Sequence, residues 1–139
     1  MTAKSIGFVG GGRVTRILLE GWRRANALPP GILVSDSHPD ALAQLKARFP
    51  GVQTTQDSHA AAAQDIVFLA VHPPVLAEVV TAIQGSVKPG AIVVSLAPKF
   101  TVSKLTAMLG GFDRLARVIP NAPSVVDFGF NPVAFAPAV

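Results

Sequence analysis

The sequence has no cysteine, no tyrosine, one tryptophan and only 14% charged residues. Without cysteine there can be no disulfide and no thiolate ligand for a metal. The sequence also shows no pair of carboxylates in a catalytic pattern, no Ser–His–Asp order and no metal-ligand spacing. We therefore expect no metal site and no catalytic centre built from side chains alone. The longest uncharged internal run, Ile66 to Ala77, is shorter than the ~20 residues needed to cross a bilayer. We therefore expect no membrane contact and, by default, a cytoplasmic protein.

Basic residues outnumber acidic ones, and the formal net charge is +4. No basic run interleaved with aromatic residues occurs, so the composition does not predict binding to nucleic acid. Four arginines instead share the first predicted helix: Arg13, Arg16, Arg23 and Arg24. A basic site for a phosphorylated ligand explains this balance with fewer assumptions. Half of the residues are hydrophobic, which over 139 residues predicts one domain with a buried core.

A short apolar run followed by three glycines lies near the start of the chain. Ile6 to Val9 predicts a strand, and apolar residues at helical spacing predict a helix that begins near Val14 and runs past Trp22. The glycines between them, Gly10, Gly11 and Gly12, predict a tight turn that leads directly from the strand into the helix.

Such a turn is suited to binding a phosphate. Glycine lets the backbone turn sharply and lets an anion approach closely, while the free N–H groups of the first helical turn point at that anion. Gly10-x-Gly12-x-x-Thr15 is a version of the dinucleotide-binding fingerprint, with threonine at the third position. Arg13 either reaches a pyrophosphate or is a solvated residue at the helix start.

Apolar runs and helical patterns alternate along the rest of the chain. The predicted strands are Ile32–Ser35, Val52–Thr54, Ile66–Val71, Ala91–Leu96 and Leu115–Ile119, and the predicted helices are Asp40–Phe49, Asp57–Ala63, Pro73–Ile83 and Thr101–Leu109. Asp57 or Ser58 can cap the second of these helices. This alternation predicts an α/β protein, a Rossmann-type doubly wound and mostly parallel sheet in a single domain over residues 1–139.

In such a sheet, ligands bind beyond the carboxyl ends of the strands. Asp36 stands at one such end, 24 positions after Gly12, close to where the fingerprint places an acid that binds ribose hydroxyls. That role favours NAD, because a carboxylate repels a 2′-phosphate. The alternatives are that Asp36 caps a helix, or that Ser35, Ser37 and His38 surround the 2′-phosphate of NADP.

Two polar side chains, His72 and Asn121, follow strands that should flank the nicotinamide half of a dinucleotide. No partner carboxylate is evident beside His72, so it is not assigned as a general acid and the catalytic residue stays unknown. Any chemistry would therefore come from a bound cofactor, NAD or NADP.

Four segments together resemble a known family. They are Ile6-Gly-Phe-Val-Gly-Gly-Gly12, Phe68-Leu-Ala-Val-His-Pro73, Val94-Ser-Leu-Ala97 and Arg117-Val-Ile-Pro-Asn-Ala-Pro123. In order and spacing they resemble the cofactor-binding half of pyrroline-5-carboxylate reductases, which belong to the F420-dependent NADP-oxidoreductase-like superfamily. The resemblance implies hydride transfer from NAD(P)H to a cyclic imine, giving proline.

The resemblance also implies roles for residues of this chain. Gly10 to Val14 would hold the pyrophosphate, and Ser35, Asp36 and Asp57 would lie round the adenosine ribose. The nicotinamide ribose would be lined by Ala70, Val71, His72, Pro73 and Ala97, and Asn121 would lie by the nicotinamide. Asp57 replaces an asparagine that is common in the family, so Asp36 and Asp57 place two carboxylates near any 2′-phosphate.

The family carries a second, helical domain that dimerises and completes the imine site, and we expect it to be absent from this chain. The isolated domain would then bind cofactor but reduce an imine poorly or not at all. The apolar segment Phe128–Val139 should finish the sheet edge and be covered by a further domain, a second copy of the chain or the sheet itself. The alternatives are a stand-alone dinucleotide-binding module without catalysis and another reductase of the same superfamily.

Overall fold

The computed structural model describes residues 3–120 and 131–139. Within these ranges the strands are β1 Ile6–Val9, β2 Ile32–Ser35, β3 Gln53–Thr55, β4 Ile66–Leu69, β5 Ile92–Ser95, β6 Leu115–Val118 and β7 Val133–Phe135. The helices are α1 Arg13–Arg24, α2 Pro39–Arg48, α3 Ser58–Ala62, α4 Pro73–Ile83, the short 3-10 helix η1 Gln84–Ser86 and α5 Val102–Met108. The predicted alternation of strands and helices is therefore confirmed.

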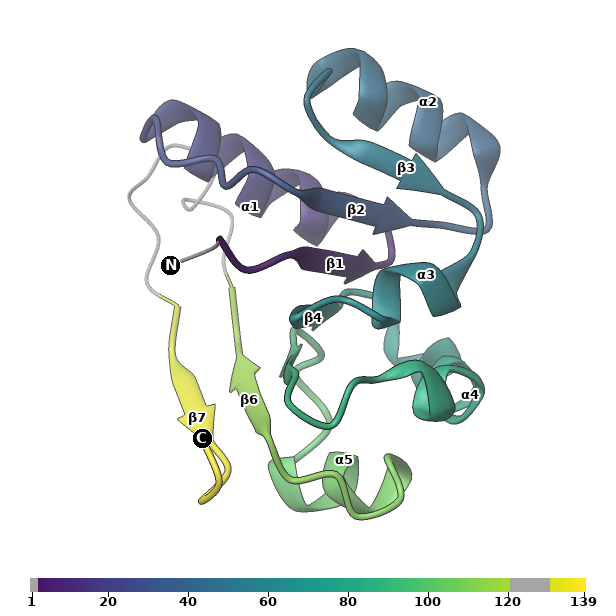
Figure 1. Cartoon of the computed structure of the whole chain (residues 1–139), viewed down its shortest axis with the longest axis vertical. Coiled ribbons are helices and arrows are strands. Elements are labelled where there is room, and N and C mark those ends of the chain that lie inside the picture. The colour runs from purple at the N-terminus through teal and green to yellow at the C-terminus, as the bar shows by residue number, and fades with distance from the viewer. Residues whose placement is uncertain (1–2, 121–130) are drawn as a thin grey trace.

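The strands form one sheet with the order β3-β2-β1-β4-β5-β6-β7 (Figure 1). Strands β1 to β6 pair in parallel, and β7 pairs antiparallel with β6. From β1 the chain builds outward in one direction through β2 to β3, then returns to the other side of β1 at β4. The point between β1 and β4 is thus the topological switch, where an open α/β sheet binds its ligands.

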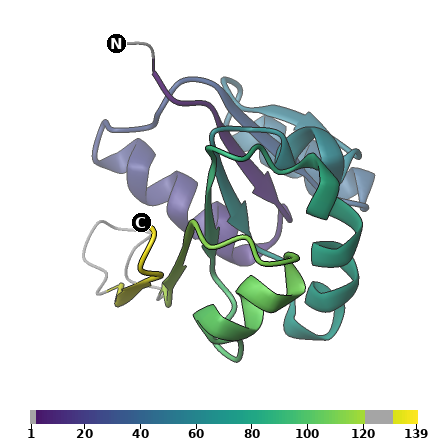
Figure 2. The same ribbon diagram turned by 60° about the horizontal axis from the view of Figure 1, so that its bottom comes forward.

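Helices cover both faces of the sheet (Figures 1 and 2). α1 and α2 contribute to an apolar cluster on one face, and α3, α4 and α5 contribute to a second cluster on the other face. The central strands are shared between the two, because Phe8 of β1 belongs to the first cluster and its neighbour Val9 belongs to the second. Successive residues of a strand point to opposite faces, so β1 is buried on both faces of the sheet. The doubly wound arrangement predicted from the sequence is therefore confirmed.

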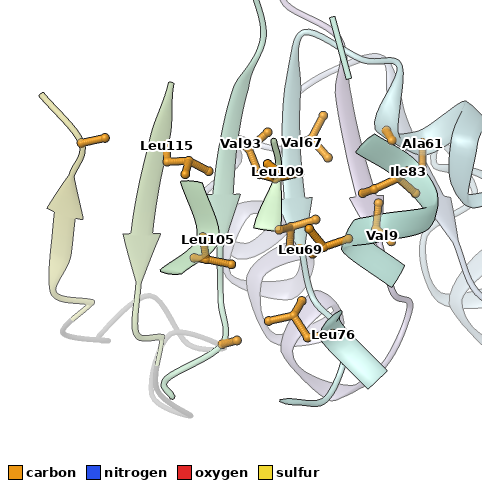
Figure 3. Packing of buried hydrophobic residues seen from close by; sticks show 14 residues of the cluster. Val9, Ala61, Val67, Leu69, Leu76, Ile83, Val93, Leu105, Leu109 and Leu115 are labelled. Carbon is orange, nitrogen blue, oxygen red and sulfur yellow. The ribbon is translucent and has the colours of Figure 1, made fainter. Parts of the chain in front are cut away.

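The second cluster is drawn in Figure 3, where Leu76 and Ile83 of α4 and Leu105 of α5 lie against the strands. On the opposite face three rings pack together. Phe8 stacks on Phe68 with ring centroids 4.7 Å apart, and Trp22 of α1 meets both rings edge-on at 6.0 Å. These rings fix α1 on β1 and β4, and so fix the position of its first turn.

The boundaries of several elements differ from those predicted by one or two residues. β4 ends at Leu69 rather than Val71, because Pro73 begins α4 and the chain must leave the sheet before it. Thr101 is the cap of α5 rather than its first residue, and its hydroxyl accepts a hydrogen bond from the Lys104 amide at 3.2 Å. Asp57 caps α3 in the same way, by accepting from the His59 amide at 2.9 Å.

The carboxyl-terminal segment finishes the sheet edge, as expected, through β7. Of the three covers expected for this segment, the sheet itself does not cover Phe135, which is 63% exposed, and cover by a further domain or a second copy of the chain stays a prediction. Its neighbour on the same face of the strand, Val133, is 47% exposed. Phe128 and Phe130 lie outside the described residues.

Candidate dinucleotide-binding site

The turn between β1 and α1 is held by Gly10. Its amide donates to the Ser35 carbonyl at 2.8 Å, and its φ of +114° lies in the region that favours glycine. A Cβ on Gly10 would lie 2.6 Å from the carbonyl oxygen of Ala70, so a side chain there would push the turn away from the loop that follows β4. Gly10 therefore brings the two loops of the topological switch into contact.

The next residue, Gly11, is bound to Asp36. The Gly11 amide donates to Asp36 Oδ2 at 2.9 Å, and Asp36 Oδ1 accepts from the His38 amide at 2.9 Å and lies 3.0 Å from His38 Nδ1. Partial burial alone would raise the pKa of Asp36, but the amides of His38 and Gly11 outweigh it and hold that pKa below its usual value. The carboxylate thus stays ionised and ties the glycine turn to the loop after β2.

The beginning of α1 is different. Among the hydrogen bonds of the described residues, none is made by the amide of Gly12, Arg13 or Val14. Gly12 is the N-cap residue of α1, and a Cβ built on it meets no heavy atom within 4 Å. Three unengaged amides at a helix N-terminus, beside open space, form a site for an anion such as a diphosphate. The residues present therefore fit the diphosphate of a dinucleotide.

Thr15 takes the third position of the fingerprint and is fully buried. Its hydroxyl donates to the Gly10 carbonyl at 2.6 Å. This bond runs from the first turn of α1 back to the turn that precedes it, so the threonine holds the helix against the strand although it is larger than the usual glycine or alanine.

The residues predicted near the adenosine ribose lie on neighbouring strand ends. Ser35 is only 2% exposed, and its hydroxyl donates to the Phe8 carbonyl at 3.3 Å. Asp57 is exposed and is engaged as the cap of α3. Both side chains therefore have structural partners within the protein, and their contact with a ribose stays a prediction.

The residues predicted near the nicotinamide ribose follow β4 and β5. Ala70 directly follows β4, and its amide donates to the Val9 carbonyl at 2.9 Å. His72 is exposed at the N-cap of α4 and makes no capping bond with its side chain, and Pro73 begins the helix. Ala97 is 3% exposed after β5. These positions and Val71 lie at the carboxyl ends of the strands, as the glycine turn does, and their contact with cofactor stays a prediction. Asn121 lies outside the described residues.

A groove between α1 and α2 was not predicted from the sequence. Its volume is about 380 Å³, and its lining includes Arg13, Arg16, Glu20, Gln44 and Arg48. The spacing of the arginines along the predicted helix was a usable signal, but the contribution of α2 depends on how the two helices pack. The groove lies beside the glycine turn, because Arg13 follows Gly12 directly.

Glu20 lines this groove, is buried, and is bound by three arginines. It accepts from Arg23 Nε at 3.0 Å, from Arg24 Nε at 3.2 Å and from an Arg48 guanidinium nitrogen at 3.0 Å. The hydrogen bond from Arg23, above all, lowers the pKa of Glu20 to about 2, against the opposing effect of burial. Glu20 therefore ties α2 to α1 as a permanently ionised group near neutral pH.

Over residues 3–120 and 131–139, no three His, Asp or Glu side chains lie together in a way that could hold a metal ion. No helix in these ranges has the length and apolar character required to cross a membrane. What the strand ends bring together is instead a set of unengaged backbone amides at the start of α1, next to the loops that follow β2 and β4. The parallel sheet, its switch at β1 and β4 and this glycine turn define a Rossmann-type dinucleotide-binding domain.

Comparison with known proteins gives the family. Residues 5–99 match the model of the family described as NADP oxidoreductase, coenzyme F420-dependent, and the chain belongs to this family. It is 33% identical over 132 residues to the pyrroline-5-carboxylate reductase of Escherichia coli (strain K12), covering 94% of this chain and 49% of that protein. The corresponding enzyme of Vibrio alginolyticus is 32% identical over 138 residues, covering 99% of this chain and 50% of that protein.

Solved structures agree with this assignment. The chain superimposes on a pyrroline-5-carboxylate reductase from Coxiella burnetii with a TM-score of 0.89 and 31% identity, over 99% of this chain and 52% of that one. The Plasmodium falciparum pyrroline carboxylate reductase, solved with NADP bound, shares the fold with a TM-score of 0.83 and 20% identity, over 98% of this chain and 49% of that one. The chain is thus homologous to the cofactor-binding part of pyrroline-5-carboxylate reductases and spans about half the length of the curated relatives it matches.

Proposed function

We propose that this chain is the NAD(P)-binding part of a reductase that transfers hydride from NAD(P)H to the C=N bond of a cyclic imine, as in the formation of proline. The observation that carries the proposal is the set of unengaged amides at Gly12, Arg13 and Val14 beside the open space at Gly12. The named activity of the relatives supports the choice of reaction, and the NADP in the Plasmodium falciparum structure supports the choice of cofactor.

In this proposal the chain's own residues bind and orient the cofactor. The first-turn amides and the positive end of α1 hold the diphosphate. The ends of β4 and β5, from Ala70 to Pro73 and at Ala97, flank the nicotinamide ribose and so set which face of the ring meets the substrate. The bound nicotinamide supplies the hydride. No residue of the chain is assigned as the acid that protonates the product.

The proposal assigns to this chain only the binding and orientation of the cofactor. On the resemblance, the rest of the imine site belongs to a helical domain. We therefore expect cofactor binding without measurable turnover when the chain is assayed alone with pyrroline-5-carboxylate and NADPH.

Titration calorimetry with NADH, NADPH, NAD⁺ and NADP⁺ tests this function. Saturable one-to-one binding of at least one of the four, competed by ADP-ribose, is the expected result, because ADP-ribose carries the same diphosphate. If none of them binds, the proposal fails. If the chain binds cofactor and also reduces the imine by itself, the proposed reaction is supported, but the expectation that a further domain is needed is wrong.

The second candidate is a dinucleotide-binding module without catalysis. It is favoured by the exposed His72, whose side chain makes no capping bond and has no acidic partner among the described contacts. The test is to join the chain to the remaining half of a homologous reductase. Imine reduction by the chimaera would favour the reductase, whereas cofactor binding without reduction would favour the module.

A further inference from the structure

The positive charge of the chain is concentrated on one side of the sheet. Six basic residues and one acid lie on α1 and in the last turn of α2: Arg13, Arg16, Arg23, Arg24, Lys46, Arg48 and Glu20. Together they carry a formal charge of +5, against +4 for the whole chain, so the charges of the remaining residues nearly cancel. An anionic ligand is therefore attracted to this side of the molecule.

The five arginines are not equivalent. Glu20 binds Arg23, Arg24 and Arg48, which leaves Arg13 and Arg16 without an acidic partner among the ion pairs of the described residues. Residues three apart on a helix share a face, so both guanidinium groups lie on the same side of the first turns of α1. That side lines the groove toward α2, beside Gln44.

Asp36, the residue expected to bind the ribose hydroxyls, is already engaged. One of its oxygens accepts from the Gly11 amide, and the other accepts from the His38 amide. Binding both hydroxyls of a ribose would require it to share or release these contacts. The expected repulsion between Asp36 and a 2′-phosphate is also reduced, because the amides of Gly11 and His38 donate hydrogen bonds to the carboxylate.

We propose that Arg13 and Arg16 bind the 2′-phosphate of NADP(H) at the end of the α1–α2 groove nearest the glycine turn, so that the chain prefers NADP(H) to NAD(H). The inference rests on the proposed function, since it places the diphosphate at the amides next to Arg13. Asp36 is bound to the Gly11 amide, and Arg13 follows Gly12 directly, so the expected ribose position and the groove lined by Arg13 and Arg16 both adjoin the glycine turn. Guanidinium groups suit this ligand because they donate several hydrogen bonds to phosphate oxygens.

The test compares NADPH and NADH by titration calorimetry in the wild type and in the variants Arg13→Gln and Arg16→Gln. We expect the wild type to bind NADPH more tightly. Each variant should lose roughly tenfold or more in affinity for NADPH, the effect of one charged hydrogen bond, and less than about threefold for NADH.

Arg24→Gln is the matched control. It removes the same charge from the same helix, about 16 Å farther along the axis, and should change neither affinity beyond about twofold, the level expected for a distant screened charge. The melting temperature of each variant without cofactor shows whether it is folded.

Each other outcome overturns the inference. Equal losses for NADPH and NADH would show that the arginines serve the shared diphosphate, and unchanged affinities would show that they are solvated. A wild type that binds NADH more tightly than NADPH would instead favour the hypothesis that Asp36 binds the ribose hydroxyls. If the wild type binds neither cofactor, the proposed function fails as well, which separates that failure from a failure of the phosphate site alone.

Discussion

Replacing Gly12 by valine should remove cofactor binding and leave the fold intact. Gly12 has a φ of −82°, which any residue can adopt, and a Cβ there would meet no heavy atom within 4 Å. We therefore expect the free energy of unfolding to fall by about 1 kcal/mol or less, the usual preference for glycine over a β-branched residue at an N-cap. The new side chain would occupy the open space above the first-turn amides, where the diphosphate is proposed to bind.

The size of the effect can be worked out for a thermal melt. Cofactor at 100 times its dissociation constant stabilises the wild type by about 2.7 kcal/mol. With an unfolding entropy of about 2.1 cal/mol/K per residue, this raises the melting temperature of a 139-residue chain by roughly 9 °C. If the variant binds 100-fold more weakly, the same concentration adds only about 0.4 kcal/mol, or roughly 1 °C.

Gly90→Val provides the control. Gly90 also has open space round its Cβ position, but it precedes β5 and so lies at the amino ends of the strands, away from the glycine turn at their carboxyl ends. This variant should keep the full cofactor shift. A Gly12→Val protein that melts normally and still shows the full shift would refute the assignment of the diphosphate to this turn; one that fails to fold would show that the glycine serves structure.

Three further variants follow from the same contacts. Gly10→Ala should lower the free energy of unfolding by several kcal/mol, because its Cβ would lie 2.6 Å from the Ala70 carbonyl at a φ of +114°; urea denaturation measures this, and an unchanged midpoint would contradict it. Thr15→Val should cost about 1 kcal/mol through loss of the bond to the Gly10 carbonyl, and Thr15→Ser should restore most of it; equal stabilities of the two variants would show that the bond is unimportant. Because the pKa of Glu20 is lowered to about 2 from its ordinary value of 4.5, its stabilising contribution is complete above pH 4.5 and is lost as the pH falls toward 2. Denaturation at a series of pH values should show a smaller loss over this window for Glu20→Gln than for the wild type, and parallel curves would exclude the contribution.

The sequence was sufficient to predict the order of the elements, because each of them is marked by strong local signals. The apolar runs at Phe68 and Val94 predict strands covered on both faces, the run at Phe8 predicts a strand, and the glycines after Val9 predict a turn. The exact ends of β4 and α5 were less certain, since they depend on where Pro73 and Thr101 redirect the chain.

The site was predicted less completely than the fold. The positions of the strand ends follow from topology, but the partners of the side chains there do not. The contact of Asp36 with a ribose stays a prediction. Its bond to the Gly11 amide was not predicted, because that bond depends on the distance between two loops that are far apart in sequence. The groove at Arg13 and Arg16 likewise requires the packing of α1 against α2, which no local pattern specifies.

Whether the opening glycine turn holds a dinucleotide diphosphate is tested most directly by backbone amide NMR during a titration with NADPH. The account predicts that the amide signals of Gly12, Arg13 and Val14 shift together and saturate at one equivalent, while those of Gly90 and Lys88 at the opposite edge stay in place. If NADPH binds and those three signals do not move, or if it does not bind at all, the central claim is contradicted.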